Sequence, residues 1–201
     1  MFGLMGKILR VDLTERKILE EGMPKEMAQK FLGGRGLATK YLFDEVKPGA
    51  DPLGPRNKLI FMSGLLTGTA SPSAGRYSVV TKSPLTNIWC QSNSGGRWGV
   101  DLKQSGFDGI IFEGMSNQPV YLIINDGKAE LHDARHLWGK NVSDMTGIIR
   151  KELGDKFNVA GIGQAGENLV KYAAIMNDLH RAAGRCGVGA VMGAKKLKAI
   201  A

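Results

Sequence analysis

Two glycine-arginine segments, 88 positions apart, constrain the fold of this chain more than any other feature. The first runs from Asn93 to Val100 and the second from Arg181 to Val188, and both contain the pattern Gly-Arg-x-Gly-Val. An expected strand, a small-residue loop and a further strand precede each of them. Chance similarity between glycine-rich stretches is the alternative, but the shared order favours an internal duplication. We therefore predict an α+β fold, a β-rich domain of two sheets with interspersed helices and approximate two-fold symmetry.

Hydrophobic periodicity and turn residues place the elements of this domain. Apolar runs predict strands at 7–13, 17–20, 58–62, 77–81, 88–90, 109–113, 120–124, 129–132, 158–162, 172–176 and 197–201. Helical spacing predicts helices at 24–32, 37–46, 99–105 and 143–153. Ser143 is the expected cap of the last helix, and Asp126-Gly127 predicts a tight hairpin turn. The 201 residues are expected to form one domain, 1–201, of a longer protein, because the strand pattern continues to Ala201.

Composition and charge narrow the class of protein. The net charge is +8, with 27 Lys and Arg against 19 Asp and Glu, which favours anionic partners. Nucleic acid is not the expected partner, because the basic residues are scattered outside Lys195–Lys198 and no helix-turn-helix, zinc-finger or aromatic RNA-binding pattern occurs. No signal peptide and no stretch able to span a membrane occurs, so we expect a cytoplasmic location. Cys90 and Cys186 are expected to be reduced thiols, and alone they could hold neither zinc nor an iron–sulfur cluster.

The candidate site is an anion site built from the glycine-arginine segments. Closely spaced glycines let N–H groups approach a phosphate, arginines add charge, and backbone carbonyls can meet a Mg²⁺ that the phosphates hold. The candidate binding residues are Arg76, Asn93, Ser94, Gly95, Gly96, Arg181, Ala182, Ala183, Gly184 and Arg185. Gly33–Gly36 is a weaker fourth part. The alternative is that the glycines only form turns and the arginines only pair with acids.

Conventional catalysis has little support in the sequence. The three histidines, His132, His136 and His180, show neither a nucleophile context nor a metal-ligand spacing, and His180 is the best placed to touch a ligand. Neither a GxGxxG dinucleotide motif after a strand nor a GxxxxGK[ST] phosphate loop occurs. Glu167 and Asp178 are expected either to hold arginines in place or to act as caps.

Ordered motifs along almost the whole chain carry a family resemblance. They are Gly33–Ala38, Gly64–Thr69, Gly75–Tyr77, Val80–Thr86, Ser92–Gly96, Gly163–Leu169, Ala174–Asp178, His180–Arg185 and Gly187–Gly193. In these motifs the chain resembles the N-terminal domain of the tungsten-containing aldehyde:ferredoxin oxidoreductase family. In that family two pyranopterins hold one tungsten, in some members molybdenum, through dithiolenes, and their phosphates share a Mg²⁺. The N-terminal domain is the base on which the two pterins rest.

The resemblance assigns roles to residues of the candidate site. It implies that Arg76, Gly95, Arg181 and the adjoining loop backbone bind a pterin or its phosphate. It also implies that Asn93 and Ala182 offer main-chain carbonyls to the bridging Mg²⁺. A pair of similar loops would thus serve a cofactor with two similar phosphate ends.

The same resemblance separates this domain from the chemistry. In the family, the four cysteines of a [4Fe–4S] cluster and the acid and histidine near the metal lie in later domains, and no such motif occurs here. No catalytic residue is therefore assigned, and the isolated chain should be inactive and should self-associate as a homo-oligomer through its exposed cofactor-facing surface. The implied function is the cofactor cradle of an enzyme that oxidises aldehydes to carboxylates, with ferredoxin as electron acceptor. The alternatives are a family member that reduces a carboxylate or an aromatic thioester, and a non-enzymatic phosphate-binding module.

Overall fold

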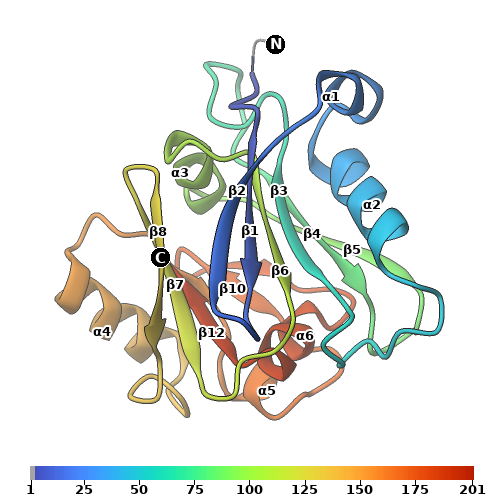
Figure 1. Cartoon of the computed structure of the whole chain (residues 1–201). Coiled ribbons are helices and arrows are strands. Elements are labelled where there is room, and N and C mark those ends of the chain that lie inside the picture. Colours follow the sequence, from blue (N-terminus) through green and yellow to red (C-terminus); the bar gives the residue numbers. More distant parts are fainter. Residues whose placement is uncertain (1–2) are drawn as a thin grey trace.

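The two halves of the chain build two six-stranded sheets with the same order of strands (Figure 1). The computed structural model describes residues 3–201. The first sheet has the order β2-β1-β6-β3-β4-β5 and the second the order β11-β10-β9-β12-β7-β8. Each half begins with a hairpin, β1–β2 or β7–β8. The first strand of the hairpin pairs parallel with the last strand of that half, β1 with β6 and β7 with β12. The other pairs are antiparallel. The α+β fold and the internal duplication are thus confirmed.

The strands of the first sheet are β1 (Lys7–Asp12), β2 (Lys17–Gly22), β3 (Leu59–Ser63), β4 (Tyr77–Lys82), β5 (Trp89–Ser94) and β6 (Gly109–Glu113). Those of the second are β7 (Val120–Asn125), β8 (Lys128–Asp133), β9 (Ala160–Gly161), β10 (Ile175–Asn177), β11 (Arg181–Ala183) and β12 (Leu197–Ile200). The helices are α1 (Lys25–Phe31), α2 (Gly34–Glu45), α3 (Trp98–Gln104), α4 (Val142–Leu153), α5 (Gln164–Glu167) and α6 (Val188–Ala194). In this described part of the chain, no helix is long and apolar enough to cross a bilayer.

One hydrophobic core lies between the two sheets. Phe61 and Val79 of the first sheet and Ile175 of the second belong to it, together with Trp98 of α3 and Val188 of α6. The outer face of the first sheet is covered by α1 and α2, and that of the second by α4 (Figure 1). Strand β3 is therefore buried on both faces, which explains its continuous apolar sequence.

Short-range signals locate most elements correctly. The β7–β8 hairpin turns at Asp126 and Gly127, which both have positive φ, 48° and 78°, as a two-residue primed turn requires. Helix α4 ends at Leu153 as expected, but its cap is Asn141 and not Ser143, because the Asn141 side chain accepts the N–H of Asp144. Helix α2 begins at Gly34, inside the glycine run that was expected to precede it.

The largest corrections concern the strands beside the glycine-arginine segments. Strand β5 continues to Ser94, although its sequence from Gln91 is polar, because six successive pairs with β4 hold it in the sheet. Residues 181–183, expected as loop, form β11. The expected strands at 158–162 and 172–176 are shorter, and α5 and α6 were not predicted.

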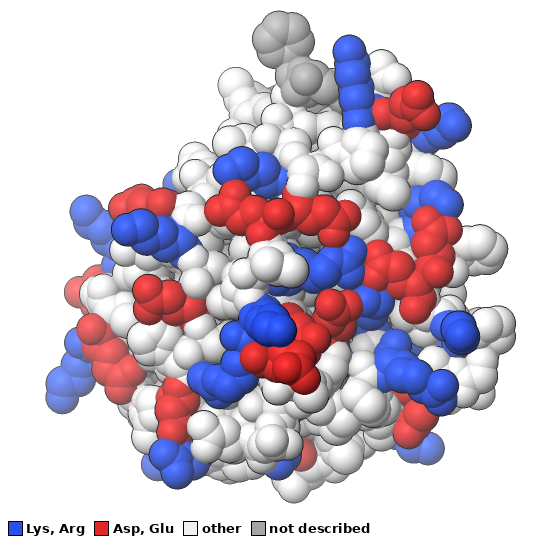
Figure 2. Space-filling model, in the orientation of Figure 1, with Lys and Arg blue, Asp and Glu red and all other residues white. Residues whose placement is uncertain are grey.

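Charged side chains of both signs are interspersed over the face shown in Figure 2, without a single basic patch on that face.

Candidate functional site

The two glycine-arginine segments lie side by side, because β5 and β11 are the edge strands at which the two sheets meet. The backbone N–H of Arg185 donates to Ser92 Oγ at 3.1 Å, and Ser83 Oγ donates to the carbonyl oxygen of Cys186 at 2.8 Å. The outer edge of a strand carries N–H and C=O groups that its own sheet does not pair. The contact between β5 and β11, together with the two glycine-arginine segments that overlap these strands, is called the seam below. It therefore combines backbone polar groups with the arginines of both segments.

Asn177 is the polar centre beneath the first segment, and sequence reasoning assigned it no role. Its side chain is fully buried; Oδ1 accepts hydrogen bonds from Tyr77 at 3.0 Å and from Ser94 Oγ at 2.5 Å. Its Nδ2 donates to the carbonyl oxygen of Gly95 at 2.8 Å. Burial raises the pKa of the Tyr77 phenol, so that this group stays protonated as the donor. Asn177, from the second half of the chain, thereby fixes the backbone of the first glycine-arginine segment at Gly95.

Asp178 caps the first segment from the second repeat. Its Oδ2 accepts the backbone N–H of Arg97 at 2.5 Å. Of the two roles considered for this carboxylate, the cap is the one that the structure shows. Its Oδ1 is the one buried side-chain oxygen or nitrogen within residues 3–201 that lacks a hydrogen-bond partner. Such an atom is suited to accept an N–H from a ligand, because a buried acceptor left unpaired costs free energy.

Close packing makes Gly96 a contact point between three parts of the site. Its φ is +93°, and a Cβ here would lie 2.0 Å from Asp178 Oδ2 and 3.2 Å from Arg181 Cγ. A Cβ on Gly75 would lie 2.6 Å from the carbonyl oxygen of Gly96. Only glycine fits at these two positions. The loop before Arg76, the first segment and Arg181 are therefore brought together, as the sequence predicts.

The fourth predicted part, Gly33–Gly36, lies against β4 on the outer face of the first sheet. A Cβ on Gly34 would lie 3.9 Å from Ser78 Oγ, and that hydroxyl donates to Asn93 Oδ1 at 2.9 Å. Helix α2 begins at Gly34 without a side-chain cap, so its first N–H groups have no side-chain acceptor. Gln91 also donates to Asn93 Oδ1, at 2.6 Å, which ties the Asn93 side chain to its own sheet.

Arg76 lines a cavity of about 320 Å³ between the loop that precedes β4 and the start of α2. Gly33, Gly64 and Thr67 line the same cavity. The Thr67 hydroxyl donates to the carbonyl oxygen of Arg76 at 2.8 Å and accepts the N–H of Gly64 at 3.0 Å. These bonds hold the loop closed at the base of the Arg76 side chain.

The arginines of the site divide into two groups. Arg97 forms an ion pair with Asp101 at 2.7 Å along α3, so for this residue the simple pairing explanation is correct. Arg76, Arg181 and Arg185 are exposed and form no ion pair within the described residues. These three guanidinium groups are available to an anion.

Glu167 and two of the three histidines lie outside the candidate anion site. Glu167 holds no arginine: it pairs with Lys198, and both side chains are almost fully buried, because α6 packs against both α5 and β12. His132 and His136 lie at the opposite end of the second sheet, beside Tyr121. His180 is exposed in the turn before β11. Within residues 3–201 no group of three or more His, Cys, Asp or Glu side chains could hold a metal.

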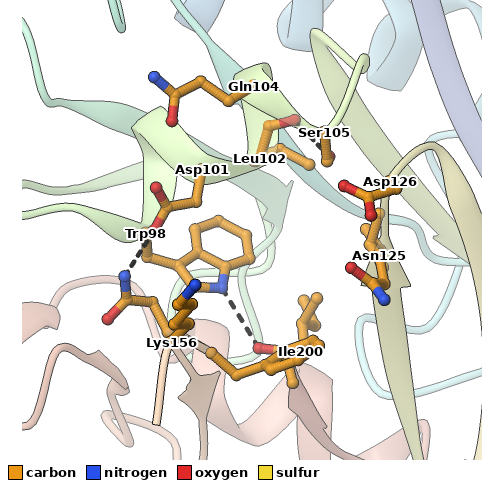
Figure 3. A pocket seen from close by; sticks show the side chains of 13 residues that line it. Trp98, Asp101, Leu102, Gln104, Ser105, Asn125, Asp126, Lys156 and Ile200 are labelled. Carbon is orange, nitrogen blue, oxygen red and sulfur yellow. Dashed lines mark hydrogen bonds between the residues drawn. The ribbon is translucent and has the colours of Figure 1, made fainter. Parts of the chain in front are cut away.

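A second cavity, of about 250 Å³, was not anticipated from the sequence (Figure 3). Trp98 and Asp101 of α3 line it together with Lys156 and Ile200. The Trp98 indole N–H donates to the carbonyl oxygen of Ile200 at 3.2 Å, and the indole stacks at a tilt 4.7 Å from the Tyr77 ring. An aromatic pair of this kind contributes about 0.5–1.5 kcal/mol beyond its buried area. Trp98 thus anchors the first segment in the core.

The chain is similar to proteins of one known family over nearly its whole length. The model of the aldehyde ferredoxin oxidoreductase N-terminal domain matches residues 8–201. The chain therefore belongs to the aldehyde ferredoxin oxidoreductase family.

Individual relatives agree with this assignment. The chain is 57% identical to a tungsten-containing aldehyde ferredoxin oxidoreductase of Thermococcus kodakarensis and 55% identical to that of Pyrococcus furiosus, covering 100% of this chain and 33% of each relative. It is 38% identical to an aliphatic sulfonate oxidoreductase, WOR-like subunit, of Pyrococcus furiosus, of which it covers 34%. The chain spans about one third of the length of these relatives.

A solved structure has the same fold. It is the active site complex BamBC of benzoyl coenzyme A reductase with 1,5-dienoyl-CoA, with a TM-score of 0.97 and 44% identity, covering 99% of this chain and 30% of that one. Two six-stranded sheets of similar topology are thus the architecture of this N-terminal domain.

Proposed function

We propose that residues 1–201 form the cofactor-cradling N-terminal domain of a ferredoxin-dependent oxidoreductase that carries a tungsten (or molybdenum) bis-pyranopterin. The observation that carries the proposal is the seam at which both glycine-arginine segments meet, with Arg76, Arg181 and Arg185 free of carboxylates within residues 3–201. The names of the relatives support tungsten, oxidoreductase chemistry and ferredoxin.

The donor set fits such a cofactor. Guanidinium groups suit phosphates, and edge-strand N–H groups add uncharged donors. Asp178 Oδ1, buried and without a partner, suits an N–H of a heterocycle such as a pterin. The main-chain carbonyls of Asn93 and Ala182 would hold the Mg²⁺ of such a cofactor, because Mg²⁺ prefers oxygen ligands.

In this proposal the residues of the chain bind the cofactor and orient it. Arg76 and Arg181 neutralise phosphate charge, Asn177 and Asp178 fix the loop that receives the cofactor, and Trp98 anchors that loop in the core. The bound metal would supply the oxidation of an aldehyde and water to a carboxylate with the release of two electrons. We assign no catalytic residue to this chain, and the cluster that passes electrons to ferredoxin belongs to the remainder of the full-length protein.

The experiment is cofactor analysis of the full-length protein. Arg76→Ala and Arg181→Ala should each reduce the bound pterin and metal, since removing one charge-assisted contact costs about 1.5–3 kcal/mol, roughly tenfold or more in affinity. Arg97→Ala is the matched control, because the Arg97 side chain is engaged with Asp101. Normal occupancy in both test variants, or absence of tungsten, molybdenum and pterin from the wild-type protein, contradicts the proposal.

A second candidate is a family member that reduces an aromatic thioester. Its support is the likeness to the benzoyl coenzyme A reductase complex, at 44% identity. Assays of the full-length protein separate the two, because aldehyde-dependent reduction of ferredoxin favours the first candidate and thioester-dependent turnover favours the second. Phosphate binding without metal or pterin would instead indicate a non-enzymatic module.

A further inference from the structure

The two cysteines of the chain, which the proposed function does not use, lie on opposite sides of the seam between the repeats. Cys90 is on the edge strand β5 and is 5% exposed. Cys186 follows Arg185 in the second glycine-arginine segment and is half-buried. Both are free thiols, and Cys186 packs against the core cluster that contains Cys90.

The strand period shows that the Cys90 side chain faces the second glycine-arginine segment. Side chains alternate along a strand, so Cys90, Ser92 and Ser94 share one face of β5, and all three are buried. That face is turned to the second repeat, since Ser94 donates to Asn177 Oδ1 and Ser92 Oγ accepts the N–H of Arg185. Cys186, the residue after Arg185, thus lies opposite Cys90.

Direct contacts place Cys186 beside the part of β5 that contains Cys90. The Cys186 thiol donates to the carbonyl oxygen of Gln91 at 3.4 Å, one residue after Cys90. Ser83 Oγ donates to the Cys186 carbonyl oxygen at 2.8 Å, which fixes the backbone of Cys186 beside β5.

The two thiols differ in their readiness to react. Burial and the neighbouring Cys186 thiol raise the pKa of Cys90, so Cys90 keeps its proton at neutral pH. Cys186 is the more accessible of the two. An attack on an oxidant therefore starts at Cys186, and Cys90 is the resolving thiol.

We propose that Cys90 and Cys186 form a reversible intramolecular disulfide that covalently joins the two repeats when the protein meets a peroxide. The Cys186 sulfur attacks one oxygen of hydrogen peroxide, the O–O bond breaks, and a sulfenic acid and one water are formed. The Cys90 sulfur then displaces the sulfenic hydroxyl, which leaves with the Cys90 proton as a second water. Two thiols and one peroxide give one disulfide and two waters, with two electrons passing from sulfur to oxygen. In a cytoplasmic setting such disulfides are transient and redox-sensing.

The disulfide would tie residues 184–187 to β5, beside the candidate cofactor seam. This inference is independent of the proposed function, because it needs only the fold and the two thiols.

The test treats the native chain with a small excess of hydrogen peroxide, then denatures it and labels the remaining thiols with N-ethylmaleimide. We expect an intact mass lowered by two hydrogens with no label added, and two labels after treatment with dithiothreitol. Trypsin should release a linked pair made of peptides 83–97 and 186–195. Two labels after peroxide, disulfide-linked dimers alone, or sulfinic acids in place of the linked peptides would overturn the proposal.

Two controls separate native proximity from chance collision. Disulfide formation should be at least about tenfold faster in the native chain than in guanidinium chloride, because folding raises the effective concentration of the two sulfurs; equal rates would overturn the proposal. In Cys90→Ala, Cys186 should accumulate a sulfenic acid that dimedone traps. In Cys186→Gly, chosen because Cys186 has a φ of 68°, the remaining Cys90 should react with peroxide at least about tenfold more slowly; equal reactivity in the two variants would refute the assigned order of attack.

Discussion

Asp178 of the second repeat accepts the backbone N–H of Arg97 of the first repeat at 2.5 Å, across 81 positions of sequence. The same carboxylate leaves Oδ1 buried and without a partner among the described residues. One side chain thus performs two tasks, since it fixes a glycine loop and presents an unsatisfied acceptor beside it. The two repeats depend on each other for the shape of the candidate site.

Asp178→Ala should lower the free energy of unfolding by about 0.5–2 kcal/mol, because the backbone N–H of Arg97, just before α3, loses the carboxylate that caps it. Urea unfolding followed by circular dichroism measures this change. Asp155→Ala, which removes an exposed carboxylate in the turn before β9, serves as the control and should change stability by less than about 0.5 kcal/mol. Equal midpoints for wild type and Asp178→Ala would show that the cap contributes nothing.

Gly96→Ala and Gly184→Ala test the two repeats at equivalent positions of the Gly-Arg-x-Gly-Val pattern. A Cβ on Gly96 meets Asp178 Oδ2 at 2.0 Å with φ at +93°, whereas a Cβ on Gly184 meets only Ala182 Cβ at 3.8 Å. Gly96→Ala should therefore lose at least about 2 kcal/mol of unfolding free energy, through strain and a displaced cap. Gly184→Ala should lose less than about 1 kcal/mol in the same denaturant experiment. Similar losses in both variants would contradict the close approach at Gly96.

Local signals in the sequence account for much of the fold. The apolar run Leu59–Met62 and the Asp126-Gly127 turn act within a few residues, so both were predicted correctly. The polar end of β5 was not, because its strand conformation comes from pairing with β4 and not from its own propensity.

In the candidate site too, residues with a local sequence signal could be predicted, and residues whose role depends on distant contacts could not. Arg76, Arg181 and the glycines could be singled out from composition and spacing, and the structure brings them together. Asn177 could not, because its role arises from contacts with Tyr77 and Ser94, about 100 and 83 positions away. A motif records the backbone that approaches a ligand, whereas the groups that hold this backbone are distributed along the chain.

The buried pair Glu167–Lys198 should stabilise the second repeat only while both partners are present. Lys198 is fully buried and Glu167 nearly so, and Glu167 also accepts the N–H of Gly139 at 2.9 Å. Glu167→Gln leaves a buried ammonium without its carboxylate and should cost about 3–5 kcal/mol in urea unfolding. Glu167→Leu combined with Lys198→Met should recover much of this loss. For comparison, Glu20→Gln breaks an exposed pair with Lys7 and should cost about 0–1 kcal/mol; a similar cost at Glu167 would contradict the prediction.

Lys195 should make stability rise with pH above neutrality. It is 1% exposed between the carbonyl oxygens of Asn57, at 2.6 Å, and Gly114, at 2.9 Å. Burial first, and then the positive charge of Lys58, lower its pKa to about 7, although Glu113 and Asp12 act in the opposite direction.

The direction of this pH dependence follows from the number of protons bound to Lys195 in the folded and in the unfolded chain. Between a folded pKa of about 7 and an unfolded pKa of about 10.4, the unfolded chain holds the Lys195 proton and the folded chain does not. The unfolded state then binds more protons, so raising the pH favours folding, by up to about 1.4 kcal/mol per pH unit. We expect the difference in unfolding free energy between wild type and Lys195→Met to grow in favour of wild type by about 1 kcal/mol between pH 8 and pH 9. Parallel urea titrations at the two pH values measure it, and a difference that is independent of pH would mean that Lys195 stays charged between its two carbonyls.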